Sequence, residues 1–156
     1  MDYSIFIEKW IGRSERKIGG DFVDIGDCFI SLWIAFNALL KSKYGEKLPD
    51  KELMGKIILD EKINKVFNEV KEKNISAQKA LKVLSEYDIL DMRDPYNNTK
   101  KINYDGSFGS LIKGLYQIRC NLFHGRKDVD EDKKDIELVG AAYEALLPIL
   151  KDYLSL

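Results

Sequence analysis

Residues 118–127, IRCNLFHGRK, contain the one histidine of the chain and several groups that can act on a phosphate. His124 follows Arg119 by five positions, and two further cations, Arg126 and Lys127, come directly after it. A histidine that titrates near neutral pH can pass protons, and a guanidinium can hold a phosphate and stabilise charge that develops on it. This pair suits metal-free RNA cleavage, in which the ribose 2′-hydroxyl attacks the adjacent phosphate. DNA lacks that hydroxyl and would be spared.

A helix must position these groups. The spacing of apolar residues predicts a helix from about Ser107 to Phe123, with Gly125 suited to end it in the left-handed conformation. Its apolar stripe consists of Leu111, Ile112, Leu115, Ile118 and Leu122. Arg119 borders this stripe, so its guanidinium is expected to be partly desolvated and to need an anion.

Five residues on a continuing helix correspond to roughly 140° of rotation, so Arg119 and His124 would not meet within one helix. Either the helix ends and the chain turns so that His124 lies near Arg119, or the two groups come from two copies of the chain and meet across a twofold axis. Asn121, three residues before His124, can hydrogen-bond to its ring or to a ligand. The alternative to a catalytic site is a histidine at a helix C-terminus that interacts with the helix dipole.

The remaining sequence also has helical periodicity, without strand-like alternation. We therefore expect an all-α fold, a bundle of about five to seven helices forming a single domain over residues 1–156. The other predicted helices span about 2–14, 21–44, 50–72, 76–87 and 130–153. Pro148 is expected to kink the last helix or to split off a short terminal piece. Residues 93–109 are rich in Asn, Gly and Asp and form a candidate flexible flap near the basic region.

The stretch CFISLWIAFNALL, residues 28–40, is apolar on nearly all sides. It predicts a central buried helix, or a helix with one side against a second subunit. Asn37 is its exceptional residue, because a buried amide must find hydrogen-bond partners. Asn37 either bonds to a neighbouring helix, or it orients the histidine or contacts substrate.

Composition excludes several classes of protein. No apolar run approaches the roughly 18–20 residues of a membrane span, and the N-terminus does not resemble a signal peptide, so we expect a cytoplasmic protein without a membrane partner. Cys28 and Cys120 are far apart and are expected to be thiols. With one histidine and two cysteines, no metal cluster is visible and no cofactor is expected, although the many acids leave a carboxylate magnesium site open.

Charge is unevenly distributed along the chain. The net charge is −1, which is no general sign of nucleic-acid binding. Residues 93–127, however, hold seven cations and two acids, a local charge of +5 that leaves −6 for the rest. This concentration is either a chance fluctuation in a highly charged chain or an anion-facing surface around the histidine.

The segment IRCNLFHGRK resembles the signature of the HEPN family, small all-helical domains with an R-x-x-x-x-H element. Arg119 and His124 match that element, and NLFHG (121–125) matches its common continuation. WIAFNALL (33–40) is similar to the buried early helix of one HEPN subgroup, with Asn37 in the matching place. The resemblance implies a helical bundle, usually dimeric with the motif at its interface, and in many members a metal-independent ribonuclease of toxin–antitoxin or defence systems.

Two positions depart from the HEPN pattern. Position 120, often asparagine in the family, is a cysteine here, which affects the expected local hydrogen bonding. A subgroup that is partnered by small nucleotidyltransferases carries a tyrosine two residues after the histidine. Arg126 stands there in this chain, so modification of such a tyrosine is not expected.

Two functions follow from the sequence. The first is an RNA endonuclease, in which Arg119 and His124 are catalytic. Its substrate-binding residues are Asn121, Arg126, Lys127 and Asn37. It acts as a homodimer without metal, with an antitoxin or a nucleotidyltransferase-type protein as a further partner. The second is a non-catalytic dimeric module that binds RNA or nucleotide, or serves as a partner subunit, with Arg119 as a phosphate anchor. A purely structural oligomer fits less well with Arg119 beside an apolar face.

Overall fold

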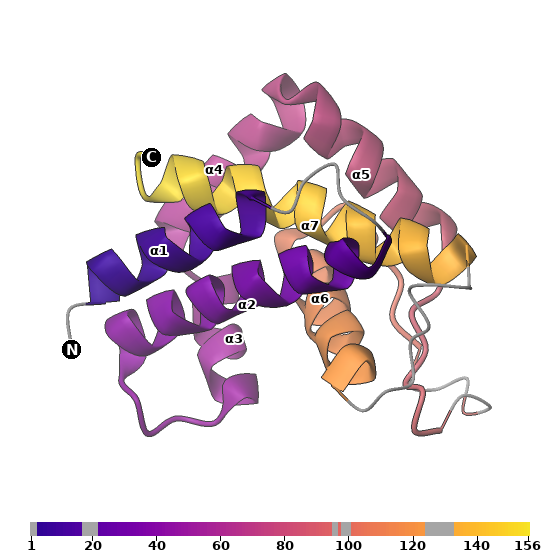
Figure 1. Ribbon diagram of the computed structural model, residues 1–156, viewed down its shortest axis with the longest axis horizontal. Coiled ribbons are helices and arrows are strands. Elements are labelled where there is room, and N and C mark those ends of the chain that lie inside the picture. The colour runs from indigo at the N-terminus through magenta and orange to yellow at the C-terminus, as the bar shows by residue number, and fades with distance from the viewer. Residues whose placement is uncertain (1–2, 17–21, 95–96, 98–100, 124–132) are drawn as a thin grey trace.

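The computed structural model describes residues 3–16, 22–94, 97, 101–123 and 133–156. Within these ranges the chain forms seven helices (Figure 1), which confirms the predicted all-α bundle. The helices are α1 (Tyr3–Glu15), α2 (Phe22–Tyr44), α3 (Asp50–Ile58), α4 (Glu61–Lys73), α5 (Ile75–Glu86), α6 (Phe108–Phe123) and α7 (Lys133–Tyr153).

Helices α2 and α7 form the centre of the bundle. They pack against each other, α2 also contacts α1, α3 and α6, and α7 also contacts α4, α5 and α6. Figure 1 shows α1 lying along α2, and α5 lying along α7. In α2, Phe29, Leu32, Ala35 and Phe36 are completely buried. The prediction of a central buried helix over this segment is therefore confirmed.

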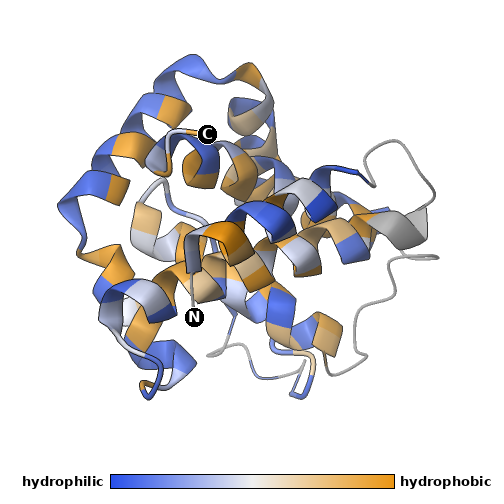
Figure 2. Ribbon diagram, turned by 60° about the vertical axis from the view of Figure 1, so that its left-hand side comes forward, coloured by the Kyte–Doolittle hydropathy of each residue, from blue (hydrophilic) through white to orange (hydrophobic). Residues whose placement is uncertain are grey.

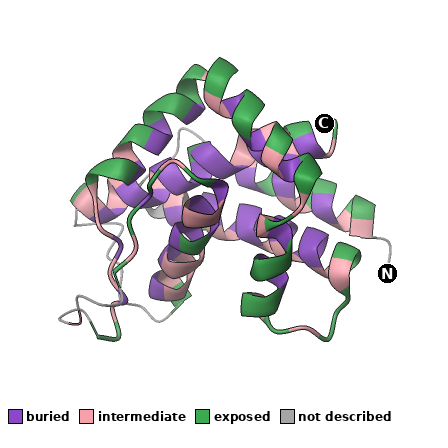
Figure 3. Cartoon of the chain, turned by 180° about the vertical axis from the view of Figure 1, so that it is seen from behind, coloured by how far each residue is buried: buried purple, intermediate pink, exposed green. Residues whose placement is uncertain are grey.

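The helices at the edge of the bundle are amphipathic, and this decides which side of each faces inward. Figure 2 shows polar and apolar residues in separate stripes along these helices, and Figure 3 shows the buried residues on their inward sides. In α4, for example, Ile63, Phe67 and Val70 are buried, whereas Lys62 and Lys65 are not.

Helix α2 comes closer to the composition of a membrane span than the sequence suggested. By length and composition alone, Ile25–Tyr44 is the one stretch of the described chain that could cross a membrane. Within it, 61% of the most apolar window is buried inside the fold, as expected of a core helix.

The single helix that we predicted over residues 50–72 is wrong, because the structure has two helices there. Leu59 ends α3, and Asp60, which has an extended backbone (φ −70°, ψ 120°), begins α4 as its N-cap. The Asp60 carboxylate accepts a hydrogen bond from the Ile63 N–H at 2.9 Å. An aspartate can bond to the backbone in this way and offers an alternative to a continuous helix. The signal was present in the sequence as an aspartate followed by Glu61.

The segment between α5 and α6 is tied to the bundle. Ile89 and Ile102 exchange two backbone hydrogen bonds, at 2.8 and 2.9 Å, in an isolated antiparallel bridge. Gly114 lets Ile89 approach α6 closely, since a Cβ at this glycine would lie 3.0 Å from the Ile89 side chain. Within the predicted flap, Ile102 is thus held by its backbone pairing with Ile89.

Helix α7 continues through Pro148 to Tyr153, so of the two expected outcomes, a kink or a separate terminal piece, the separate piece is not formed. Pro148 cannot donate to the carbonyl of Glu144, one turn earlier. Glu144 is exposed, so solvent can satisfy that carbonyl, while the buried side chains of Leu146 and Ile149 hold both halves of the helix in the core. The predicted helix starts at residues 21 and 130 and the predicted helix end at Gly125 lie outside the described residues.

The cap at Asp60 generates a prediction. Asp60→Ala removes the side-chain acceptor of the Ile63 N–H and should lower the free energy of unfolding by about 1 kcal/mol. Asp60→Asn keeps the acceptor and should retain most of the stability. Urea denaturation followed by circular dichroism measures both. Equal losses in the two variants would mean that the charge of Asp60, for example in its ion pair with Lys43 at 3.5 Å, matters more than the cap.

Candidate active site

Arg119 lies on the last turns of α6 with its guanidinium against aromatic rings. Its side chain is 27% exposed. The guanidinium carbon lies 4.4 Å from the ring centroid of Phe123 and 6.0 Å from that of Tyr116, within the range of cation–π attraction. The Arg119 Nε is buried and has no hydrogen-bond partner among the described residues. As predicted, the residue stands beside the apolar stripe and is partly desolvated.

One carboxylate approaches Arg119 within the described chain. Asp50, the first residue of α3, places an oxygen 3.9 Å from the Arg119 guanidinium, a loose ion pair with 32% of the Asp50 side chain exposed. The Asn37 amide donates a hydrogen bond to the other oxygen of Asp50 at 3.3 Å. Asn37 therefore bonds to a neighbouring helix, one of the two alternatives that its sequence left open. Through Asp50 it also connects α2 to the arginine of the motif.

Asn121 is buried and links α6 to the segment after α5. Its amide donates to the Leu90 carbonyl at 2.8 Å, and its oxygen accepts from the Met92 N–H at 3.1 Å and from Gln117 at 3.0 Å. The side chain is 1% exposed. We predicted that Asn121 binds substrate; here its amide holds the Leu90–Met92 backbone against α6.

Phe123 is the last residue of α6 that the structure describes, and 56% of it is exposed. Four predicted residues, His124, Gly125, Arg126 and Lys127, lie outside the described part of the chain. Of the predicted site residues, the structure therefore connects Arg119 with Asn37, and Asp50 lies between them. The distance from Arg119 to His124 stays a matter of prediction.

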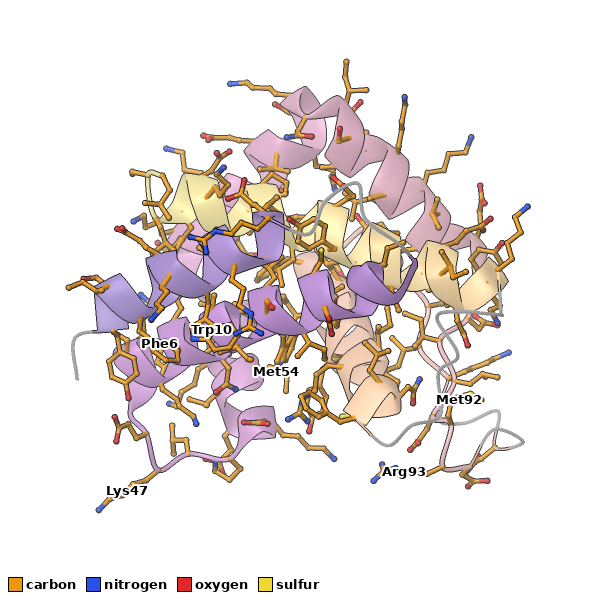
Figure 4. The ribbon with its side chains drawn as sticks, viewed as in Figure 1. Phe6, Trp10, Lys47, Met54, Met92 and Arg93 are labelled. Carbon is orange, nitrogen blue, oxygen red and sulfur yellow. The ribbon has the colours of Figure 1, made fainter. Side chains whose placement is uncertain are left out.

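A cavity of about 700 Å³ opens beside Arg119, between α3 and α6. Lys51, Met54, Gly55 and Ile58 line it from one face of α3, and Lys113, Tyr116, Gln117 and Cys120 line it from one face of α6, both at spacings of three and four residues. Asp91, Arg93 and Ile102 complete the wall from the segment between α5 and α6. Figure 4 labels Met54 on α3, and Met92 and Arg93 on the segment after α5.

Cations outnumber acids in this wall. Arg93 donates to both oxygens of Asp91, at 3.1 and 3.0 Å, and this pairing raises the pKa of Arg93. Lys51 and Lys113 are exposed, and neither has a hydrogen-bond or ion-pair partner among the described residues. Burial, followed by the contact with Cys120, raises the pKa of Tyr116, so its phenol stays protonated at neutral pH. The cavity can thus attract an anion and donate hydrogen bonds to it.

No group of three or more His, Cys, Asp or Glu side chains in the described ranges is arranged to hold a metal ion. Both cysteines are free thiols, with Cys28 buried and Cys120 half-buried.

Sequence reasoning missed Asp50 and the cavity residues Lys51, Gly55 and Lys113. Asp50 followed a proline and was recognised only as a helix start. Lys113 belonged to the basic segment 93–127, but its place on the side of α6 opposite the apolar stripe could have been read from the helical period.

Comparison of the chain with protein-family models, curated proteins and solved structures gives no match. The likeness to the HEPN family therefore depends on the two motif segments of the sequence.

The hydrogen bonds of Asn121 generate a prediction about stability. Asn121→Ala leaves the Leu90 carbonyl and the Met92 N–H without their partners, which should lower the free energy of unfolding by about 1–3 kcal/mol. Asn103→Ala, at an exposed position of the same segment, should change it by less than about 0.5 kcal/mol. Urea denaturation measures both, and equal small effects would show that Asn121 does not hold this segment.

The loose pair of Arg119 and Asp50 generates a second prediction. Because about a third of each side chain is exposed and their nearest N and O atoms are 3.9 Å apart, their coupling should not exceed about 1 kcal/mol. A double-mutant cycle with Arg119→Gln and Asp50→Asn, measured by denaturation, gives this energy. A coupling of several kcal/mol would mean that Asp50 holds Arg119 too tightly for an anion to replace it.

Proposed function

We propose that the chain is a metal-independent RNA endonuclease that acts as a cytoplasmic homodimer in a toxin–antitoxin or defence system. The environment of the Arg119 guanidinium is the observation that supports this proposal. Its guanidinium is half-buried, rests against two aromatic rings, and has a loose carboxylate contact and an unpartnered Nε within the described chain. An arginine held in this way retains the capacity to bind a phosphate oxygen.

In the proposed reaction, Arg119 binds the scissile phosphate and stabilises the charge that develops on its oxygens. His124 accepts the proton of the 2′-hydroxyl as its oxygen bonds to phosphorus, and returns the proton to the 5′-oxygen as the bond from phosphorus to that oxygen breaks. The products are a 2′,3′-cyclic phosphate and a 5′-hydroxyl. In a dimer, Arg119 of one copy and His124 of the other serve one phosphate, consistent with their separation of roughly 140° on a single helix.

The other proposed substrate-binding residues fall into two groups. Arg126 and Lys127 extend the basic segment and suit contacts to neighbouring phosphates. Asn37 and Asn121 hold other parts of the site in place. Asn37 bonds to Asp50, and Asn121 bonds to the Leu90–Met92 backbone. These two act as positioning residues in this proposal.

A second candidate function is a non-catalytic dimeric module that binds RNA or nucleotide and works with a partner subunit, such as an antitoxin or a nucleotidyltransferase. The contact of Asp50 with Arg119 favours it, because a carboxylate next to the guanidinium offsets part of its charge. The net charge of −1 also favours modest RNA affinity.

An RNA cleavage assay in excess EDTA separates the two functions. Wild type should cut RNA and leave cyclic-phosphate ends, and His124→Ala and Arg119→Ala should each lose at least about 100-fold in rate. Lys79→Ala, at an exposed position of α5, is the matched control and should cleave like wild type. Equal cleavage by all four proteins would indicate a contaminant, and no cleavage of varied RNAs by wild type would favour the binding module.

A further inference from the structure

We propose that the cavity between α3 and α6 is a subsite for one nucleotide of single-stranded RNA, next to the phosphate held by Arg119. The choice of RNA rests on the proposed function, whereas the subsite rests on the cavity itself. The volume of about 700 Å³ falls within the roughly 300–1,000 Å³ of typical small-molecule sites.

The wall of the cavity has two kinds of surface that a nucleotide requires. Met54, Ile58 and the ring of Tyr116 provide apolar and aromatic contact for a base. Lys51 and Lys113 provide positive charge that no described carboxylate neutralises. Because Arg119 lines the same cavity, a phosphate on its guanidinium and the adjoining nucleotide can be bound together.

Gly55 leaves open space in the wall of the subsite. Glycine is unfavourable inside a helix, and α3 has only nine residues. No close packing accounts for it, because a Cβ at this position would have no atom within 4 Å. Since Gly55 lines the cavity, any larger side chain there would occupy the space that the proposed nucleotide needs.

This geometry provides a variant that fills the cavity without disturbing the fold. Gly55→Leu adds a side chain into open space at a position where leucine favours the helix more than glycine does. Gly12 of α1 is the matched control, because a Cβ there also has no atom within 4 Å and Gly12 does not line the cavity. Both Gly55→Leu and Gly12→Leu should be helical by circular dichroism, with a Tm no lower than that of wild type.

The test measures binding of a fluorescein-labelled, 2′-O-methylated single-stranded RNA of mixed sequence by fluorescence anisotropy. The 2′-O-methyl groups prevent attack by the 2′-oxygen, so binding is separated from cleavage. Gly55→Leu should weaken the affinity at least about tenfold, and Gly12→Leu should bind like wild type. Lys113→Ala should lower the slope of log affinity against log salt by about 0.7, the value for one phosphate contact of a single strand, whereas Lys79→Ala should not.

The outcomes distinguish failure of the subsite from failure of the proposed function. A folded Gly55→Leu variant that binds RNA as wild type does would overturn the subsite, even if RNA cleavage requires Arg119 and His124. Absence of RNA binding by wild type would overturn it as well. Binding that depends on Gly55 and Lys113, in a protein that cleaves no RNA, would support the subsite and contradict the nuclease.

Discussion

Burial of the apolar stripe of α6 is the constraint on which the candidate site depends. Leu111, Ile112, Leu115 and Ile118 are buried in the core at 0–1% exposure, and this sets the rotation of the helix about its axis. With that rotation set, Lys113, Tyr116, Gln117 and Cys120 must lie on the opposite side, where the cavity is. Arg119 falls between the two sides, which explains why it is half-buried and still lines the cavity.

The surroundings of Arg119 balance two opposing requirements. A fully buried arginine without a partner would be costly, and a tightly paired one could not bind a phosphate. The loose contact with Asp50 and the rings of Tyr116 and Phe123 offset the cost of burial without enclosing the guanidinium. This environment suits an arginine that exchanges one anion for another.

Two residues determine the shape of the cavity wall. Gly55 inside α3 is less favourable than alanine by about 0.5–1 kcal/mol, and it leaves the wall of the cavity open. Asn121 is the second, and its side chain is buried at 1% exposure. Its hydrogen bonds with the Leu90 carbonyl and the Met92 N–H hold this backbone against α6, and Asp91 and Arg93 of the same segment form part of the cavity wall.

The sequence by itself determined the all-α class, the central position of residues 28–40 and the place of Arg119 beside an apolar stripe, because each follows from helical periodicity and burial. It did not determine the break at Asp60, where a side-chain cap competes with a helical pattern that continues across it. Only the tertiary structure decided that Asp50 connects Asn37 to Arg119, since this contact joins residues from three helices. The cavity beside Arg119 was likewise decided by how α3 packs against α6, which no local pattern encodes.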